Sequence, residues 1–587
     1  MKYQQSSLSI LEAKITSSCY SGCMFRKRTA ILILIGVGLL IYVNSLSNAF
    51  LGDDRPQILN NLQIHNLSSV PSFFLGSTYY NGGLTRLTGL YYRPLMLSGY
   101  DVLYSLFGPN PFPFHLVQVS IHIINALLVF TIFGLFFPLV AAFLLSLLFL
   151  IHPINNEAVV YIANLQDVLF VCFGLGAILF FIRKEKQILK FKTLALSGLF
   201  LLLSLFTKET GVAFIAVLLL YIFLYIRGKN PWLYTPLIGS FLFYIFSRYF
   251  IAHIGITKSQ AVAPIATATL FERLITMPAI IATYLTTFFF PLNLSSSHYW
   301  IVTSVTSPDF YLSLLEDVGF ASACGIAIMW IRKKHMKKLP QFLFFLGWFA
   351  IGLLPHMQFI PLDTTIAERW FYFSGIGLIG MIGTVFLCIQ IKKTVLKKTL
   401  YLGVAVLFIL LSIRTFFRNF DWQDGVTLYT HDIKVTKSSF LLDDALGSEL
   451  LIAGEYEEAK PYITDSVKLY PFYANLNNAA IIAFHEKNLS QTKYYLQQAL
   501  MHDGNYAVYE NYANFLVAYY SPKEAKIFTK SALEKYPNDP KILFDYGKAE
   551  YVLGNKIPAL SALKKSETIE PSERTEKFIA QIENDSK

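Results

Sequence analysis

Two adjacent carboxylates, Asp53 and Asp54, follow the first long apolar run of the chain, in the string Gly52-Asp53-Asp54-Arg55. Charged side chains are costly to hold beside lipid, so a purely structural role explains this pair poorly. A carboxylate next to a hydroxyl can accept its proton while a new bond forms. Paired carboxylates can also hold a divalent cation such as Mg²⁺ or Mn²⁺. The pair is therefore the first candidate for chemistry, either as a base or as a cation site.

A second group of charged residues could bind a substrate that carries a phosphate. Arginine grips phosphate through two parallel hydrogen bonds, and lysine acts as a point charge. Such positive charge stabilises a phosphate as it leaves. The candidates for phosphate or substrate binding are Arg93, Glu157, Asp167, Lys208, Glu209 and Arg369.

Structural roles stay open for each of these residues. Arg93 could cap a loop or reach lipid headgroups. Asp54-Arg55 could be a local ion pair, Lys208-Glu209 could pair with other loops, and Glu368-Arg369 could be a structural bridge.

Histidines and cysteines do not predict a metal site. His115 and His122 share one helix face but have no third ligand, which favours a core role. His152 precedes Pro153, and the proline favours a helix end there. Five scattered cysteines predict neither a disulfide scaffold nor a metal centre. The sequence identifies no cofactor. A divalent cation, Mg²⁺ or Mn²⁺, bound by the paired carboxylates stays an open alternative.

The composition indicates the environment of these groups. The chain has 587 residues, of which 54% are hydrophobic and 15% charged, whereas roughly a quarter of a soluble protein is charged. We therefore expect a polytopic membrane protein. The net charge of +11 is not read as a nucleic-acid footprint, because the basic residues cluster in short loops between apolar runs and report orientation.

Eleven apolar runs are long enough to cross a bilayer, although the third is short. They lie near residues 29–47, 114–135, 137–151, 161–182, 191–206, 211–226, 232–252, 312–331, 341–355, 370–391 and 399–417. A twelfth stretch, 271–290, is ambiguous. If it does not cross, every basic cluster falls on the cytoplasmic side, as the positive-inside bias requires. The N-terminus is then inside, the C-terminus is outside, and the candidate residues other than Asp167 lie in outer segments.

The composition changes to that of a soluble helical protein from about residue 440. A period of about 34 residues, with Gly454, Asn488 and Gly554 between paired helices, resembles tetratricopeptide repeats (TPR). About four repeats fit between 440 and 573. Such arrays bury their core by stacking and leave a concave surface suited to extended peptides.

These boundaries predict an all-α protein with two main parts. We expect a cytoplasmic tail (1–28), a transmembrane domain (29–420) with an extracytoplasmic loop (48–113), a linker (421–439), a repeat α-solenoid (440–573) and a C-terminal tail (574–587).

Several strings occur in an order that points to a family. They are Tyr92-Arg93-Pro94-Leu95, Asn110-Pro111-Phe112, His152-Pro153 with Glu157-Ala158-Val159, Lys208-Glu209-Thr210, Pro291-Leu292-Asn293-Leu294-Ser295, Ala367-Glu368-Arg369 and Trp422-Gln423-Asp424. Joined to the repeats, this set resembles the transmembrane and TPR repeat-containing (TMTC) protein O-mannosyltransferases and bacterial relatives of the GT-C type. The resemblance covers about residues 30 to 570.

The resemblance implies a GT-C-type glycosyltransferase that takes a sugar, mannose or another hexose, from a polyprenyl- or dolichyl-phosphate carrier. The acceptor would be a hydroxyl, in the eukaryotic branch of a protein Ser or Thr. Asp53 or Asp54 would be the base; of the two arrangements we favour Asp53 as the base, with Asp54 orienting acceptor or metal. One string departs from the family: Asn164-Leu165-Gln166-Asp167 keeps the carboxylate but lacks the arginine of the usual Gly-Arg-Ala-Asp, so a phosphate or sugar contact there is in doubt.

The expected partners are the lipid-phosphate sugar donor, a protein acceptor bound through the repeats, and the membrane, with no nucleic acid. The membrane is a bacterial inner membrane or the endoplasmic reticulum, with the repeats on the extracytoplasmic side. One alternative keeps the donor but changes the acceptor to a lipid or an envelope glycan. Another makes the chain a non-enzymatic membrane scaffold whose repeats dock partners.

Overall fold

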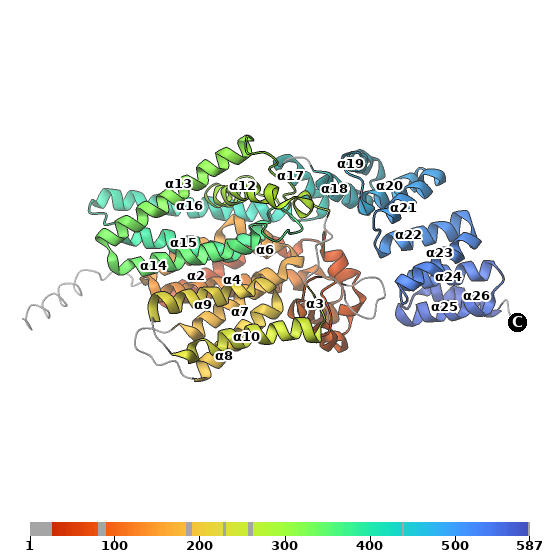
Figure 1. Cartoon of the computed structure of the whole chain (residues 1–587), viewed down its shortest axis with the longest axis horizontal. Helices are drawn as coiled ribbons and strands as arrows, with labels where there is room; N and C mark the ends of the chain where they lie inside the picture. The colour runs from red at the N-terminus through yellow and green to blue at the C-terminus, as the bar shows by residue number, and fades with distance from the viewer. Residues whose placement is uncertain are drawn as a thin grey trace, which may run out of the picture.

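The computed structural model describes residues 26–79, 90–182, 191–226, 230–255, 262–436 and 439–584 (Figure 1). These residues form helices, turns and irregular segments, and no β-strand occurs among them. The predicted all-α fold is therefore confirmed. Residues 1–25 of the predicted tail, 183–190 of the predicted basic loop at 183–192, and the predicted loop 227–229 lie outside the described residues.

Apolar helices form the first part of the chain and make it a multi-pass membrane protein. Among the described residues, eight helices are long and apolar enough to cross a membrane: Lys27–Ser47, Pro111–Phe136, Ile162–Phe181, Glu209–Ile226, Pro308–Lys334, Met336–His356, Glu368–Cys388 and Thr394–Asp421. A bent pair, Leu139–Ile151 and Pro153–Val160, makes nine if it is one span. Two of the eleven predicted runs are shorter apolar helices, Phe191–Thr207 and Thr235–Ile251.

The helices of this part are α2 (Lys27–Tyr42), α3 (Pro94–Phe107), α4 (Pro111–Phe136), α5 (Leu139–Ile151), α6 (Asn156–Val160), α7 (Leu165–Phe181), α8 (Phe191–Thr207), α9 (Val212–Tyr221), α10 (Thr235–Phe246), α11 (Pro264–Thr267), α12 (Leu270–Phe289), α13 (Pro308–Lys334), α14 (Leu339–Leu353), α15 (Phe371–Cys388) and α16 (Thr394–Asp421). The ambiguous stretch forms α12, which is not among the candidate spans.

A proline breaks the chain between α5 and α6. Pro153 has no N–H to continue the helix, and the two segments meet at an angle of 52°. The side chain of His152 accepts a hydrogen bond from the N–H of Ile154, and Asn155 donates to the carbonyl of Phe149. These bonds satisfy groups that the break frees, and α6 with Glu157 is left wholly buried.

The segment between α2 and α3 is built of short helices rather than a long loop. They are η1 (Val43–Ser47), η2 (Arg55–Leu59), η3 (Leu62–His65) and η4 (Leu67–Phe74). Apolar side chains in this segment, including Ile58, Ile64 and Phe73, are fully buried in the membrane domain's core. The segment that carries Asp53 and Asp54 is therefore part of a packed structure.

The C-terminal part is an array of paired helices. The predicted linker contains α17 (Gly425–Val435), and four pairs follow: α18 (Phe440–Ala453) with α19 (Tyr456–Leu469), α20 (Tyr473–His485) with α21 (Leu489–Met501), α22 (Tyr506–Phe515) with α23 (Pro522–Lys535), and α24 (Pro540–Val552) with α25 (Lys556–Ile569). The final helix, α26 (Glu573–Asn584), occupies the predicted C-terminal tail and buries Ile582 against α24 and α25.

The turns between paired helices lie where the sequence placed them. Gly454 and Gly554 have positive φ angles of 85° and 84°, a conformation that favours glycine. Asn488 caps α21 by accepting the N–H of Gln491.

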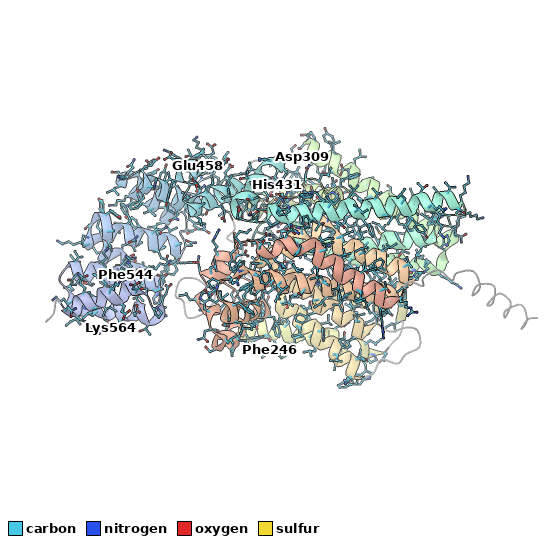
Figure 2. The ribbon with its side chains drawn as sticks, turned by 180° about the vertical axis from the view of Figure 1, so that it is seen from behind. Phe246, Asp309, His431, Glu458, Phe544 and Lys564 are labelled. Carbon is cyan, nitrogen blue, oxygen red and sulfur yellow. The ribbon has the colours of Figure 1, made fainter. Side chains whose placement is uncertain are left out.

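The array leaves the membrane domain at α17 and α18 and curves around toward the loops beside α3 (Figure 1). Figure 2 shows the same arrangement from behind, with His431 at the junction and Phe544 and Lys564 in the far repeats. Glu570, at the end of α25, is close enough to act on the charge of His65 in η3. The last repeat therefore lies near the segment that follows α2.

Candidate active site

A tight turn holds the two carboxylates. Gly52 has a φ of +48°. A Cβ atom at this position would lie 2.8 Å from the hydroxyl of Tyr161 and 3.0 Å from that of Tyr429, closer than real side chains allow. Only glycine fits this conformation and this space. The Tyr161 hydroxyl also accepts the N–H of Asp53 at 2.6 Å, which fixes the backbone of the next residue.

Asp54 is buried and its carboxylate binds the backbone. One oxygen accepts the N–H of Leu51 at 3.0 Å, and the other accepts the N–H of Ala163 at 2.6 Å. Burial raises the pKa of Asp54 well above its usual value, and these two hydrogen bonds oppose that shift. Asp54 thus closes the turn and ties it to the start of the α7 span.

Asp53 points the other way, and its side chain is exposed. Dense protein nonetheless surrounds it, and this desolvation raises its pKa above the usual value; the charge of Arg369 lowers that pKa and the charge of Asp363 raises it. Burial raises the pKa values of the Tyr299 and Tyr429 hydroxyls, and the negative charge of Asp53 raises them further.

Arg55 links the turn to the repeats. Its guanidinium forms two parallel hydrogen bonds with the carboxylate of Glu449 on α18, one of them at 2.8 Å between Nη2 and Oε2. The N–H of Gly52 also donates to Glu449, at 3.4 Å. Glu449 packs on Gly425, where a Cβ atom would lie 2.1 Å from its carboxyl carbon. Arg55 therefore forms its ion pair with a residue 394 positions away rather than with its neighbour Asp54.

Arg93 lies in a network with Glu209. Its Nε donates to Glu209 at 3.0 Å, while the other oxygen of Glu209 accepts the N–H of Tyr92 at 2.8 Å and lies 3.5 Å from Arg248. The guanidinium stacks on Tyr91, 4.2 Å from the ring centre, and the Tyr91 hydroxyl donates to Asp363 at 2.7 Å. The side chain of Arg93 remains 13% exposed.

Two further ion pairs lie next to each other. Lys208 contacts Asp167 at 2.5 Å, and both side chains are buried. Arg369 pairs with the fully buried Glu157, which also accepts the N–H of Arg369 at 2.8 Å. The side chain of Arg369 is 22% exposed. Burial lowers the pKa of Lys208, and the positive charges of Arg93 and Arg369 lower it further.

A small cavity separates these two pairs. It is lined by residues that include Asp167, Lys208, Arg369, Thr210 and His356, and its volume is about 10 Å³. Asp167 Oδ2, Thr210 Oγ1 and His356 Nδ1 are buried without a hydrogen-bond partner among the described residues. The cavity can hold roughly one water molecule and is too small for a phosphate group.

All eight predicted site residues are described, and interactions connect them. Asp53, Arg369, Glu157, Lys208 and Asp167 form one chain of interacting charges. Arg93, which forms an ion pair with Glu209, is connected to this chain by its charge interaction with Lys208. Asp54 anchors the turn. Their assignment as catalytic or phosphate-binding groups stays a prediction.

Some neighbours in the sequence face different partners. Glu368 accepts the N–H of Ser295 at 2.7 Å and so points away from Arg369's partner Glu157. His122 contacts the hydroxyl of Tyr372 at 2.7 Å, and His115 contacts the carbonyl of Asn48, both in the core. No group of three metal-ligating residues occurs in the part of the chain that the structure describes, and we derive no step through a metal.

The structure adds residues that sequence reasoning missed: Tyr161, Asp363, Tyr429 and Glu449. Asp363 lies in a predicted outer segment, so the orientation of the spans could have drawn attention to it. No sequence signal distinguishes Glu449 from other residues of the repeat array or Tyr429 from other residues of the linker, because their role depends on how α17 and α18 pack against the membrane domain.

The chain is similar to curated proteins that carry TMTC names. It is 23% identical to protein O-mannosyl-transferase TMTC3 of Homo sapiens over 79% of this chain and 53% of that protein. It is 23% identical to protein O-mannosyl-transferase F38B6.6 of Caenorhabditis elegans over 79% and 67%, and 32% identical to human TMTC1 over 35% and 25%. The resemblance expected from the motifs is thus confirmed.

The chain spans about half the length of the first two curated relatives. No protein-family model matches it. Among solved structures, YrrB, a TPR protein with an unusual peptide-binding site, covers 31% of this chain at 16% identity, with a TM-score of 0.24.

Proposed function

We propose that the chain is a membrane glycosyltransferase that moves a sugar, mannose or another hexose, from a polyprenyl- or dolichyl-phosphate carrier to a hydroxyl group of a protein. The reaction takes place on the extracytoplasmic side. One observation carries the proposal: the exposed carboxylate of Asp53 sits on a fixed backbone next to Arg369. The names of the relatives, protein O-mannosyl-transferases, support the same activity.

Each side chain has a task in this reaction. Asp53 accepts the proton of the acceptor hydroxyl as its oxygen attacks the anomeric carbon. The bond between that carbon and the phosphate oxygen breaks, and the carrier leaves as polyprenyl phosphate. Arg369 and Arg93, the partly exposed cations, stabilise the negative charge on the phosphate.

The remaining candidates position these two arginines. Glu157 and Glu209 each hold one guanidinium and also bind a main-chain N–H beside it. The buried pair of Lys208 and Asp167 supports Arg369 from behind, across the small cavity. This arrangement keeps both arginines oriented before a phosphate arrives, so little reorganisation is needed in the reaction.

The test is transfer by purified full-length protein in detergent or nanodiscs. The assay supplies radiolabelled dolichyl-phosphate mannose and a Ser/Thr-containing peptide. Asp53→Asn removes the base but keeps the size of the side chain, so we expect transfer to fall by about 100-fold or more. Asp465→Asn, an exposed aspartate on α19, is the matched control and should transfer normally. Full activity of Asp53→Asn would refute the role of the base.

The acceptor class is tested in cells. Mass spectrometry of extracytoplasmic proteins should find hexose on Ser or Thr with the gene and lose it without the gene. Hexose added only to lipid or envelope glycan would change the acceptor. Full cellular function of the Asp53→Asn protein together with loss of function on deletion of the repeats would instead indicate a docking scaffold.

A further inference from the structure

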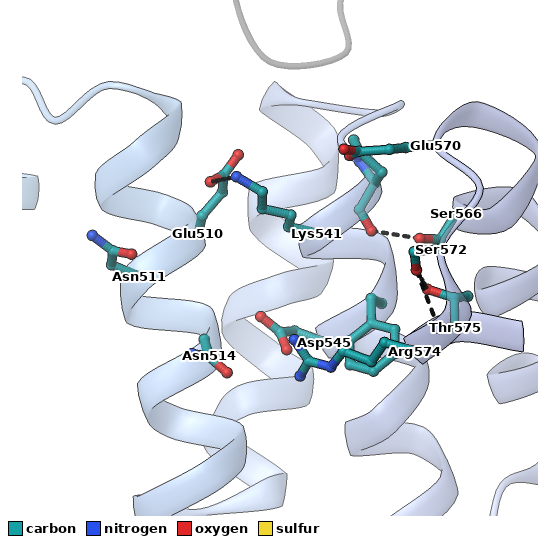
Figure 3. A pocket seen from close by; sticks show the side chains of 12 residues that line it. Glu510, Asn511, Asn514, Lys541, Asp545, Ser566, Glu570, Ser572, Arg574 and Thr575 are labelled. Carbon is teal, nitrogen blue, oxygen red and sulfur yellow. Dashed lines mark hydrogen bonds and ion pairs between the residues drawn. The ribbon is translucent and has the colours of Figure 1, made fainter. Parts of the chain in front are cut away.

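A polar pocket lies at the far end of the array, between α22, α24 and the start of α26. Its volume is about 330 Å³, and pockets for small ligands begin at roughly 300 Å³. Side chains of α22 and α24 form two walls, and Ser572, Arg574 and Thr575 form the third (Figure 3). The pocket therefore depends on α26, a helix outside the four pairs, and has room for one small molecule.

Asp545 on α24 is buried in this pocket without a partner. The residue is 4% exposed and lines the pocket, but its carboxylate makes no hydrogen bond or ion pair in the part of the chain that the structure describes. Burial raises the pKa of Asp545 to about 7, and the charge of Arg574 opposes this shift. Buried carboxylates normally have hydrogen-bond partners. This one therefore indicates a ligand that donates hydrogen bonds.

Two cations supply donors in the same pocket. The Arg574 guanidinium lies over the ring of Phe544, 4.1 Å from its centre. Nζ of Lys541 donates to Glu510 at 2.9 Å, and an ammonium group has further N–H donors. Both cations line the pocket, so they can donate to a ligand while Asp545 accepts from it.

The mixture of charges selects against an ionic ligand. The ionisable residues of the lining are the acids Glu510, Asp545 and Glu570 and the bases Lys541 and Arg574. A phosphate or carboxylate would meet Asp545, and an amine would meet Arg574 and Lys541. Taking an ion out of water is costly unless its surroundings neutralise it. The pocket therefore favours a neutral ligand that both donates and accepts hydrogen bonds.

A sugar ring meets these requirements. Each hydroxyl has one donor and two acceptor lone pairs, so neighbouring hydroxyls can donate to Asp545 and accept from a cation. Asn511 and Asn514 on α22 offer further donors and acceptors. Pro540 and Phe544 add apolar surface, which matches the C–H groups on the face of a sugar ring. The lining thus complements a hexose on its rim and on its face.

The pocket is distinct from the candidate active site but lies near the membrane domain. None of the eight candidate residues around Asp53 lines it. Glu570 does line it, and the charge of Glu570 opposes the lowering of the pKa of His65 in η3 that burial causes. A ligand in the pocket would therefore be held beside the segment that follows α2.

We propose that this pocket binds a single hexose residue, with Asp545 accepting hydrogen bonds from its hydroxyls. The pocket then recognises the kind of group that the chain transfers, and this link alone rests on the proposed function. Binding itself is independent of any transfer.

The binding test uses the full-length protein in nanodiscs prepared without sugar-based detergents, which would compete. Saturation-transfer difference NMR, which detects weak ligands, is applied to the methyl glycosides of mannose, glucose and galactose. We expect at least one glycoside to bind, and neither spermidine, a cation, nor glycine, a zwitterion, to displace it. Binding of none of the three glycosides, or displacement by spermidine or glycine, would overturn the proposal.

One variant locates the site. Asp545→Leu removes the buried acceptor, and because the carboxylate has no described hydrogen-bond partner, the fold should persist, which circular dichroism checks. It should bind the glycoside at least about tenfold more weakly than the wild type. Asp465→Leu makes the same change on α19, where the side chain is 62% exposed, and should bind normally. Equal affinities of Asp545→Leu and the wild type would overturn the proposal.

A second variant keeps the test decisive if Asp545→Leu does not fold. Asn514 is exposed and lines the pocket, so Asn514→Ala carries little risk to folding. The loss of its hydrogen bonds should lower the affinity for the glycoside roughly fivefold. An unchanged affinity would count against the pocket as the binding site.

A transfer assay on the same wild-type preparation separates this inference from the proposed function. Glycoside binding that depends on Asp545, without any transfer of mannose to a peptide, would refute the proposed function and leave this inference standing. Transfer without glycoside binding at the pocket would refute this inference alone.

Discussion

The ion pair between Arg55 and Glu449 makes a strong prediction about the turn that carries Asp53. Glu449→Gln keeps the shape of the side chain but removes its charge and turns one accepting oxygen into a donor. The amide then faces a guanidinium that needs two acceptors. The turn should open more often, because the contact that fastens it to α18 is weakened.

The exposure of the two side chains sets the size of the effect. Glu449 is 7% exposed and Arg55 is 25% exposed. Breaking a fully buried pair costs about 3–5 kcal/mol, and breaking an exposed pair costs at most about 1 kcal/mol. This pair lies between these limits, so we expect about 2 kcal/mol, which corresponds to a roughly 30-fold larger open population.

Hydrogen exchange measured by mass spectrometry reports this opening directly. Peptides that cover Leu51 to Asn60 should exchange roughly 30-fold faster in Glu449→Gln than in the wild type. The matched control is Glu486→Gln, which breaks the exposed pair with Lys460, where the side chains are 31% and 49% exposed. Its local exchange should change by less than about fivefold.

Two results would refute the reasoning. One is unchanged exchange of the turn in Glu449→Gln, and the other is an equal effect in both variants. A third measurement checks the cause: in Arg55→Gln/Glu449→Gln the second substitution should cost less than it does alone, because no unpaired charge remains.

Three further predictions concern single aspartates. Asp54→Asn should lose transfer activity and show faster hydrogen exchange of the turn, since the new NH₂ group would face the N–H donor of Leu51 or Ala163. Asp53→Asn should lose activity but keep normal hydrogen exchange of the turn. Asp363→Asn keeps a partner for Tyr91 but removes a charge that raises the pKa of Asp53. Because a base must be deprotonated, the acid limb of the pH–rate profile should move to lower pH, and a move to higher pH would contradict the assignment. Burial raises the pKa of Asp545 to about 7, so the folded array binds more protons than the unfolded chain between about pH 4 and 7 and should lose stability as pH rises. Asp545→Asn should reduce the fall in unfolding temperature between pH 5 and pH 8, and an undiminished fall would show that another group is responsible.

Much of the fold could be predicted because it depends on local patterns. Apolar runs of about 20 residues form helices in a membrane, and Gly454 and Gly554 lie at turns that need a positive φ. The break at Pro153 follows from the missing N–H alone. The short apolar helices α8 and α10 are where the pattern is weakest, because length and composition do not settle whether such helices cross.

The partners of the charged residues could not be predicted, because they depend on tertiary packing. Lys208 and Glu209 are adjacent, yet one binds Asp167 in the interior and the other binds Arg93 and Arg248. Glu368 and Arg369 separate in the same way. A 3₁₀ turn begins within each string and directs consecutive side chains to different sides.

The geometry of the turn favours Asp53 over Asp54 as the base. Both oxygens of Asp54 are engaged by main-chain N–H groups, so its carboxylate cannot turn toward a substrate without breaking the loop. Asp53 is held through its backbone instead, by the bond from its N–H to Tyr161 and by the bond that its carbonyl accepts from Gln57. Its side chain is left facing solvent.

The string Gly52-Asp53-Asp54-Arg55 joins the two parts of the protein. Asp54 binds the membrane domain at Ala163, and Arg55 binds the first repeat at Glu449, while Asp53 lies between them. A rotation of the repeats against the membrane domain would therefore pull on the backbone of the base itself.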